Sequence, residues 1–277
     1  MIIIIIMIYL FLINYKFKIK YNYIIIYNNI NRLLGVRIHY KPKFNKNPIL
    51  IAALPDMGNV AGLCLNFLVK KINAKIFAEI YSFWPPSVTY KNGIINYMQS
   101  SYKFYENSEY NILFFTGDFN PTDPRRLYEL CYEVLKIAEM FNVNILYSLG
   151  ASLKPINSIE KLVYAAVNKP EMISELNKLN LQILEDEGQI TGFNGLILGI
   201  AQEFNLDGIC LLGEIDNPNV IQPKTSQEIL KVLLKIINLS FINLSELEEE
   251  EKRKKFMEKQ MNYYNKAINQ SDLPGIT

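Results

Sequence analysis

The sequence contains few of the residues on which most enzyme sites and disulfide scaffolds depend. Its 277 residues include one histidine, three cysteines and one tryptophan, with only 13 glycines and 12 prolines. Three cysteines without a CxxC pair exclude a disulfide framework and favour buried, reduced thiols in a cytosolic protein. A single histidine, His39, argues against a histidine-based zinc site and a Ser-His-Asp triad. The low glycine and proline content excludes collagen-like and linker-like chains.

Acidic residues are absent from the first 55 positions. The whole chain has 29 bases and 27 acids, a net charge of +2, yet eight of the bases and none of the acids precede Asp56. The first 55 residues therefore carry +8, and the remaining 21 bases and 27 acids sum to −6. Such an asymmetry indicates a basic extension attached to an acidic domain.

The extension begins with an apolar run, Met1–Ile13, which is followed by lysines. The run is shorter than the roughly 20 residues that a membrane-spanning helix needs. A signal peptide would place its positive charge before the apolar run, not after it. Three interpretations stay open: an interfacial anchor with its lysines on anionic lipid, an additional structured element, or sequence upstream of the true start. We expect residues 1–35 to lie outside the packed fold, with membrane contact only if residues 1–20 are genuine.

Strands and helices alternate from about Asn47 onward. Pro48–Ala53 is a continuous apolar run, typical of a strand covered on both faces. The alternation predicts an α/β fold: a single domain with a mostly parallel sheet flanked by helices, plus a charged C-terminal helix. We divide the chain into an N-terminal extension (1–46), the α/β domain (47–243) and the C-terminal helix with its tail (244–277). Expected strands are 74–82, 93–105, 110–116, 143–149, 161–167 and 208–213, and expected helices are 59–71, 124–141 (capped by Asp123), 170–180, 195–204, 223–239 and 244–268.

Several turns at the ends of the predicted strands carry glycines or polar side chains. In an open α/β sheet such turns converge on a crevice, the usual position of a ligand. The candidate ligand-binding residues are Asp56, Gly58, Asn59, Asp118, Gly150, Gly192, Asn194, Gly195 and Glu214. The glycines alternatively serve tight turns and close packing, and the carboxylates alternatively cap helices or face solvent.

Two kinds of chemistry are conceivable for this crevice. The start of the helix after Gly192 could hold an anion with its backbone N–H groups. Glu214 could pair with Asp56 or Asp118, as paired carboxylates do in acid–base or Mg²⁺ chemistry. Neither GxGxxG nor GxxxxGK[ST] occurs in the chain, so nucleotide binding lacks its usual motifs. We therefore expect no catalytic residue, no metal and no cofactor.

The C-terminal helix carries charges of both signs. Acids over Glu246–Glu251 precede bases over Lys252–Lys255, with Glu248–Lys252 and Glu250–Lys254 at a four-residue spacing that favours an exposed helix. Mixed charge argues against nucleic-acid binding, which needs a surface of one sign. The chain ends in a short apolar tail that either docks into a partner or frays, and its candidate docking residues are Leu273, Ile276 and Thr277.

Four segments in order resemble the proteasome assembly chaperone 2 family. They are ILIAALPDMGNVAGLCLNFL (49–68), AEIYSFWPPSV (78–88), GQITGFNGLILGI (188–200) and GICLLGE (208–214). The resemblance covers about residues 47–245. The matching turn residues, which the resemblance suggests are structural, are Pro55, Gly58, Gly62, Pro85, Pro86, Gly192, Gly195 and Glu214.

The resemblance implies a nucleoside-phosphorylase-like fold, a homo-oligomer and an archaeal type of cell, and the reduced cysteines favour a cytoplasmic location. Its implied role is non-catalytic: binding proteasome α subunits during assembly. Some archaeal members are thought to dock through a terminal hydrophobic residue, a tyrosine and one further residue, whereas this chain ends in Gly275-Ile276-Thr277 without the tyrosine. The alternative is a nucleotide- or anion-binding enzyme, related to ATP-grasp ligases or phosphorylases, that uses the crevice.

Overall fold

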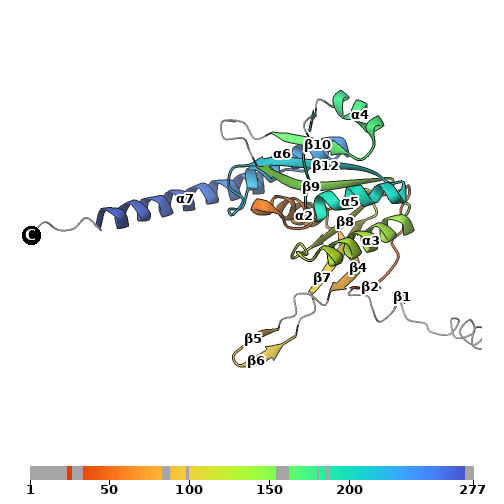
Figure 1. The fold of residues 1–277 in the computed structure, drawn as a ribbon, viewed down its shortest axis with the longest axis horizontal. Helices are drawn as coiled ribbons and strands as arrows, with labels where there is room; N and C mark the ends of the chain where they lie inside the picture. The colour runs from red at the N-terminus through yellow and green to blue at the C-terminus, as the bar shows by residue number, and fades with distance from the viewer. Residues whose placement is uncertain are drawn as a thin grey trace, which may run out of the picture.

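The computed structural model describes residues 24–26, 34–82, 88–97, 100–153, 162–179, 181–184 and 187–271. A ten-stranded sheet in the order β1-β2-β4-β7-β8-β3-β9-β12-β10-β11 forms its centre, and a separate two-stranded sheet pairs β5 with β6 (Figure 1). The strands are β1 (Ile24–Ile26), β2 (Leu34–Ile38), β3 (Ile49–Ala52), β4 (Lys75–Ser82), β5 (Thr89–Lys91), β6 (Ile94–Asn96), β7 (Ser100–Asn107), β8 (Ile112–Gly117), β9 (Ile145–Leu153), β10 (Val163–Val167), β11 (Gln182–Ile183) and β12 (Asp207–Ile215). The α-helices are α2 (Val60–Lys71), α3 (Pro124–Met140), α4 (Ile173–Lys178), α5 (Phe193–Ala201), α6 (Pro223–Ile236) and α7 (Ser245–Ser271).

The middle of the large sheet is parallel. β3 pairs with β8 on one side and β9 on the other, and β9 pairs with β12, all in parallel. β2, β4 and β7 continue the sheet beyond β8 in antiparallel pairs, and β10 runs antiparallel to β12. The expected α/β domain with helices flanking the sheet is confirmed. The sheet itself is mixed. β7 and β8 run antiparallel because the short turn 108–111 joins them, and β4 pairs antiparallel with both β7 and β2.

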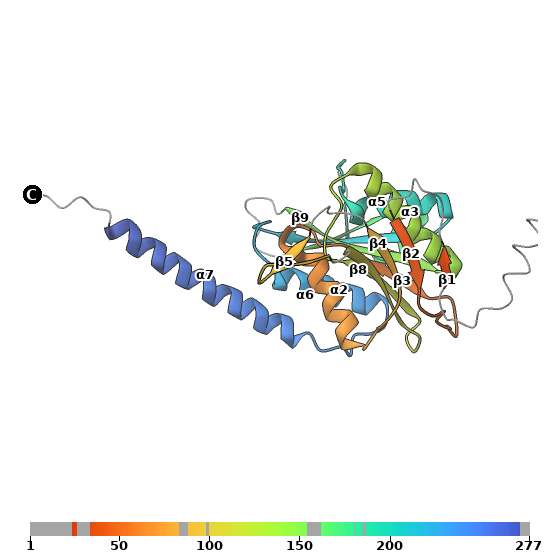
Figure 2. The ribbon, with the colours of Figure 1, turned by 90° about the horizontal axis from the view of Figure 1, so that it is seen from below.

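Helices cover both faces of the parallel strands. Leu50 and Ala52 of β3 belong to a core with α3 and α5, whereas Ile51 and Ala53 belong to a second core with α2 and α6. Figure 2 shows the sheet between these two helix pairs. Successive side chains of a strand point to opposite faces, so a strand covered on both sides must be apolar throughout. This requirement accounts for the uninterrupted apolar run at β3.

The start of α3 follows from local sequence. Asp123 caps the helix, since its carboxylate Oδ1 accepts a hydrogen bond from the Arg126 backbone N–H at 3.0 Å. Pro124 occupies the first turn, where no backbone donor is needed. The helix and its cap are both as predicted.

The segment around residues 93–105 differs from the single strand expected from its alternating pattern. β6 pairs with β5 in a hairpin, and β7 begins only at Ser100, where it pairs with β4. The hairpin turn is Asn92-Gly93, whose φ angles of 52° and 77° suit a tight two-residue connection. Alternation is the same in both strands, so it does not reveal that they belong to different sheets.

The large sheet includes residues upstream of Asn47. β2 pairs with β4, and its residues Leu34 and Val36 pack against the core shared with α3 and α5. β1 pairs in turn with β2. Residues 34–46, assigned above to the extension, thus include a strand of the main sheet. The expectations for Met1–Ile13 fall on residues outside the described ranges.

The first turns of α7 lie against the body, and the rest of the helix extends away from it (Figure 1). Leu247 is buried in the core with α2 and α6. Glu248 accepts a hydrogen bond from Gln227 of α6 at 2.7 Å, and Lys254 donates one to Gln222 at 3.3 Å. Glu248 therefore binds α6 and Lys254 binds the residue before it, and within α7 Lys254 also pairs with Glu258 at 3.8 Å. None of the helices in the described ranges is long and apolar enough to cross a membrane.

Candidate functional site

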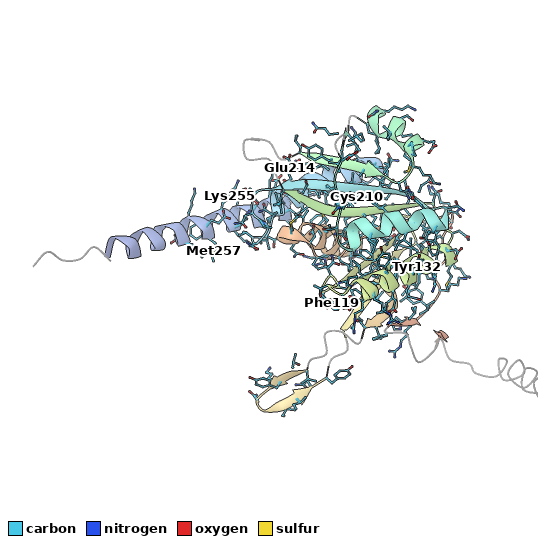
Figure 3. All side chains as sticks on the ribbon, viewed as in Figure 1. Phe119, Tyr132, Cys210, Glu214, Lys255 and Met257 are labelled. Carbon is cyan, nitrogen blue, oxygen red and sulfur yellow. The ribbon has the colours of Figure 1, made fainter. Side chains whose placement is uncertain are left out.

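Five of the nine candidate residues line one cleft, which we call the Asp56 cleft. They are Asp56, Gly150, Gly192, Asn194 and Glu214, and the cleft has a volume of about 1290 Å³. Its lining includes residues of β9, β10 and β12, the segments 181–184 and 187–192, and Asn194 of α5. Figure 3 shows Glu214 toward the carboxyl end of β12, beyond Cys210. The cleft thus occupies the position expected for a ligand in an α/β fold.

Asp118 and Asn59 lie elsewhere. Both line a second, smaller cavity of about 340 Å³, together with Lys103 and Gly117. The structure therefore brings Asp56 and Glu214 to one cleft but does not bring Asp118 there. Asp118 follows β8, on the far side of β3 from β9 and β12, so its turn opens at a different place on the sheet edge.

Gly58 lines neither cavity and serves the turn before α2. Its φ angle is +64°, a backbone conformation that glycine adopts without strain. Its N–H donates to the Pro218 carbonyl at 2.8 Å, and its carbonyl accepts from the Gln222 N–H at 3.0 Å. A side chain there would collide with Gln222. Gly58 thus joins the turn after β3 to the segment that leads into α6.

Asp56 combines a structural contact with an unusual environment. Its carboxylate Oδ1 accepts a hydrogen bond from the Ala61 backbone N–H at 2.9 Å, at the start of α2. Its Oδ2 is buried and has no hydrogen-bond partner among the described residues. Burial raises the pKa of this carboxyl to about 7, although the nearby N–H groups of Ala61 and Ala151 partly offset the effect. Asp56 therefore changes its charge close to neutral pH.

Glu214 is fully occupied by structural contacts. It is almost completely buried, and its two carboxylate oxygens accept hydrogen bonds from the Leu162 N–H at 3.2 Å and the Tyr164 hydroxyl at 3.0 Å. Both donors belong to β10 or the residue before it. The carboxylate thus holds β10 against β12, and it is less free to act on a ligand than its place at the cleft suggests.

Asn194 fixes the first turn of α5 to the end of β3. Its side-chain Oδ1 accepts from the Leu54 N–H at 2.9 Å, and its Nδ2 donates to the Leu54 carbonyl at 3.2 Å. Its own carbonyl accepts from the Ser148 hydroxyl at 2.5 Å. Gly192 precedes the helix with a φ angle of +74° and lies beside Asn120. These contacts set the wall of the cleft.

Sequence reasoning missed Tyr164 and Asn120, which also line the cleft. Asn120 follows the end of β8 closely, a position that could have drawn attention to it. Tyr164 lies within β10, and only the pairing of β10 with β12 brings it to the cleft. No local pattern in the sequence reveals that pairing.

The charge of the Asp56 cleft argues against an anionic ligand. Of its described lining residues, Asp56, Glu187 and Glu214 are acidic and none is lysine, arginine or histidine. A phosphate-binding site normally presents cationic side chains or free backbone N–H groups. The described lining therefore lacks the charged groups that would hold a nucleotide.

The described residues offer little for nucleophilic or metal chemistry. All three cysteines are free and buried, and burial raises the pKa of each thiol, that of Cys210 to about 12. Such thiols stay protonated and unreactive at neutral pH. Within the described ranges, no group of three or more His, Cys, Asp or Glu side chains could hold a metal ion.

The raised pKa of Asp56 predicts a specific pH dependence of stability. The folded state holds the proton up to about pH 7, while the unfolded chain releases it near pH 4, so stability falls as pH rises between these values. Between pH 5 and pH 8 the loss should be about 2–3 kcal/mol. Asp56→Asn retains an acceptor for Ala61 and should remove this loss, as measured by urea unfolding at both pH values. Asp118→Asn, at an exposed carboxylate, is the control and should behave like the parent protein.

Two glycines of α5 offer a matched test of packing. A Cβ at Gly195 would lie 2.1 Å from the Ile190 carbonyl oxygen, whereas a Cβ at Gly199 would meet nothing within 4 Å. Gly195→Ala should therefore destabilise the protein by at least about 2 kcal/mol. Gly199→Ala should be neutral or stabilise it by up to about 1 kcal/mol, through helix propensity. Equal effects in thermal unfolding would contradict the close approach at Gly195.

Comparisons with known proteins identify sequences and structures similar to this chain. The model of the PAC2 family matches residues 50–261. An uncharacterized protein of Methanocaldococcus jannaschii, MJ1210, is 31% identical over 218 residues, which cover 77% of this chain and 83% of that protein.

Solved structures share the fold. Pyrococcus furiosus PbaB, described as an archaeal proteasome activator, matches with 26% identity and a TM-score of 0.72 over 83% of this chain and 98% of its own. P. furiosus PbaA, described as an archaeal homolog of proteasome-assembly chaperone, matches with 23% identity and a TM-score of 0.69 over 87% of this chain and 98% of its own. With the family model matching more than 200 consecutive residues, from β3 into α7, the chain belongs to the PAC2 family.

Proposed function

We propose that this protein is a non-catalytic assembly chaperone or adaptor that binds proteasome α subunits in the cytoplasm. The observation that carries the proposal is the similarity to PbaB, at 26% identity over 98% of that chain. Membership of the PAC2 family supports a chaperone-like role. Three free, buried thiols are consistent with a reducing compartment.

The projecting part of α7 is the surface best suited to reach a large partner. Its base is held by Leu247 in the core and by a 2.6 Å ion pair between Lys71 and Glu246. Farther along, Phe256, Met257 and Met261 are each more than 60% exposed. Apolar side chains on a projecting helix offer contacts that the body of this chain does not use. The tail residues Leu273, Ile276 and Thr277 follow this helix and remain proposed docking residues outside the described ranges.

The alternative function, a nucleotide- or anion-binding enzyme, finds mixed support in the cleft. The cleft is large, and Asp56 has the raised pKa that a general acid or base would need. Its acidic lining nevertheless disfavours phosphate, and the second carboxylate, Glu214, is engaged by β10. We therefore interpret Asp56 as the cap of α2 and not as a catalytic residue.

Binding to purified proteasome α subunits tests the proposal, with affinity measured by biolayer interferometry or by co-migration in gel filtration. We expect the full chain to form a complex. Replacing the apolar tail residues together, Leu273→Ala with Ile276→Ala, should weaken the complex about tenfold, because apolar anchors dominate such contacts. Asp272→Ala, in the same tail, should leave the affinity unchanged.

Two results would count against parts of this proposal. Absence of any complex with the full chain, under conditions in which a known chaperone binds the same subunits, would refute binding to α subunits. A complex that is insensitive to the double tail variant would assign docking to the body or to α7 instead of the tail.

A further inference from the structure

The hairpin formed by β5 and β6 is not covered by any other described part of the chain. All ten residues from Val88 to Tyr97 are exposed. The two strands pair in antiparallel register, with Tyr90 opposite Ile95, across the Asn92-Gly93 turn. Figure 1 shows the hairpin apart from the large sheet. A two-stranded hairpin is at best marginally stable in water without further packing.

The two faces of the hairpin differ sharply in composition. Side chains alternate along each strand, so one face carries Val88 and Tyr90 from the first strand with Ile95 and Tyr97 from the second. These four are 51%, 80%, 70% and 66% exposed. We call them the apolar hairpin face. The opposite face carries Thr89, Lys91, Ile94 and Asn96, a mixture typical of a surface that stays in water.

No described side chain of the body covers the apolar hairpin face, as the exposed fractions require and Figure 3 shows. Aromatic and β-branched residues opposite each other across two strands form a continuous surface. Contiguous exposed apolar surface of this kind marks an interaction site in a folded protein.

We propose that this face packs against the same face of a second copy of the chain, forming an interface related by twofold symmetry. The face carries no charged side chain, so its complement is another apolar surface. Other copies of the same chain are always available as partners. In a twofold interface the same patch of both copies is in contact, so the patch needs to be complementary only to itself. A partner bound only transiently would leave the hairpin uncovered in the free protein.

The area of the apolar hairpin face agrees with a second copy of the chain as its partner. A buried aromatic side chain covers about 150–250 Å², so two tyrosines and two aliphatic side chains supply on the order of 500 Å² per copy. Two copies together reach about 1,000 Å², the lower limit for a specific interface. Lys91 lies on the other face and keeps its charge in solvent.

Neighbouring isoleucines provide the test. Ile94 and Ile95 are 68% and 70% exposed but lie on opposite faces. Threonine keeps the β-branched shape that strands favour and removes apolar contact. In sedimentation velocity over a concentration series, the parent protein should self-associate, and Ile95→Thr should raise the dissociation constant at least about tenfold. Ile94→Thr should leave it unchanged. A monomeric parent protein, or equal effects of the two variants, would overturn the proposal.

Crosslinking tests the face-to-face arrangement separately. The three native cysteines are buried, so an engineered surface thiol reacts alone. Ile95→Cys should give a covalent dimer under mild oxidation, and Ile94→Cys should not. Loss of association in Ile95→Thr without a crosslink in Ile95→Cys would overturn the twofold pairing. Neither experiment involves proteasome subunits, so its outcome is independent of the function proposed above.

Discussion

The candidate site depends on the contact between Asn194 and Leu54. One amide side chain satisfies both backbone groups of Leu54, the residue with which the chain leaves the buried β3 segment, with hydrogen bonds of 2.9 and 3.2 Å. Leaving such buried groups without partners costs about 1–3 kcal/mol each. The same contact holds the start of α5 beside the end of β3 and thereby places Gly192 and Asp56 on one cleft. The shape of the cleft follows from a requirement of the backbone.

Because structural contacts shape the cleft, it contains polar side chains but, among its described lining residues, no cationic group that would bind phosphate. Its two buried carboxylates make structural contacts as well as lining the cleft. Asp56 caps α2, and Glu214 joins β12 to β10. The raised pKa of Asp56 arises from burial and so from the packing of the turn against β9. A perturbed carboxylate in a cleft is often functional, but structural carboxylates are perturbed by the same physics. In this chain the contacts favour the structural interpretation.

Much of the fold could be predicted from the sequence where one local rule decides the outcome. The apolar run at β3, the Asp123 cap of α3 and the burial of the cysteines each follow from one rule of this kind. Pairing between distant strands follows no such rule. The contact of β10 with β12 brings Tyr164 to Glu214, and the position of β8 separates Asp118 from the cleft. The candidate site was therefore predictable as a set of turns, but not as a set of neighbours.

The apolar hairpin face and the exposed apolar side chains of α7 differ in what their geometry can accomplish. The apolar hairpin face is continuous and uncharged and lies on a hairpin that needs further packing, which suits a lasting contact between identical copies. The exposed apolar side chains of α7 lie beyond the base that anchors the helix and are surrounded by charge, as the ion pairs of Glu251 with Lys255 and Lys254 with Glu258 show. Charge around apolar anchors limits self-association and favours a partner with complementary charge. If both proposals hold, assembly with itself and binding to another protein use separate surfaces, and neither contact requires a catalytic group.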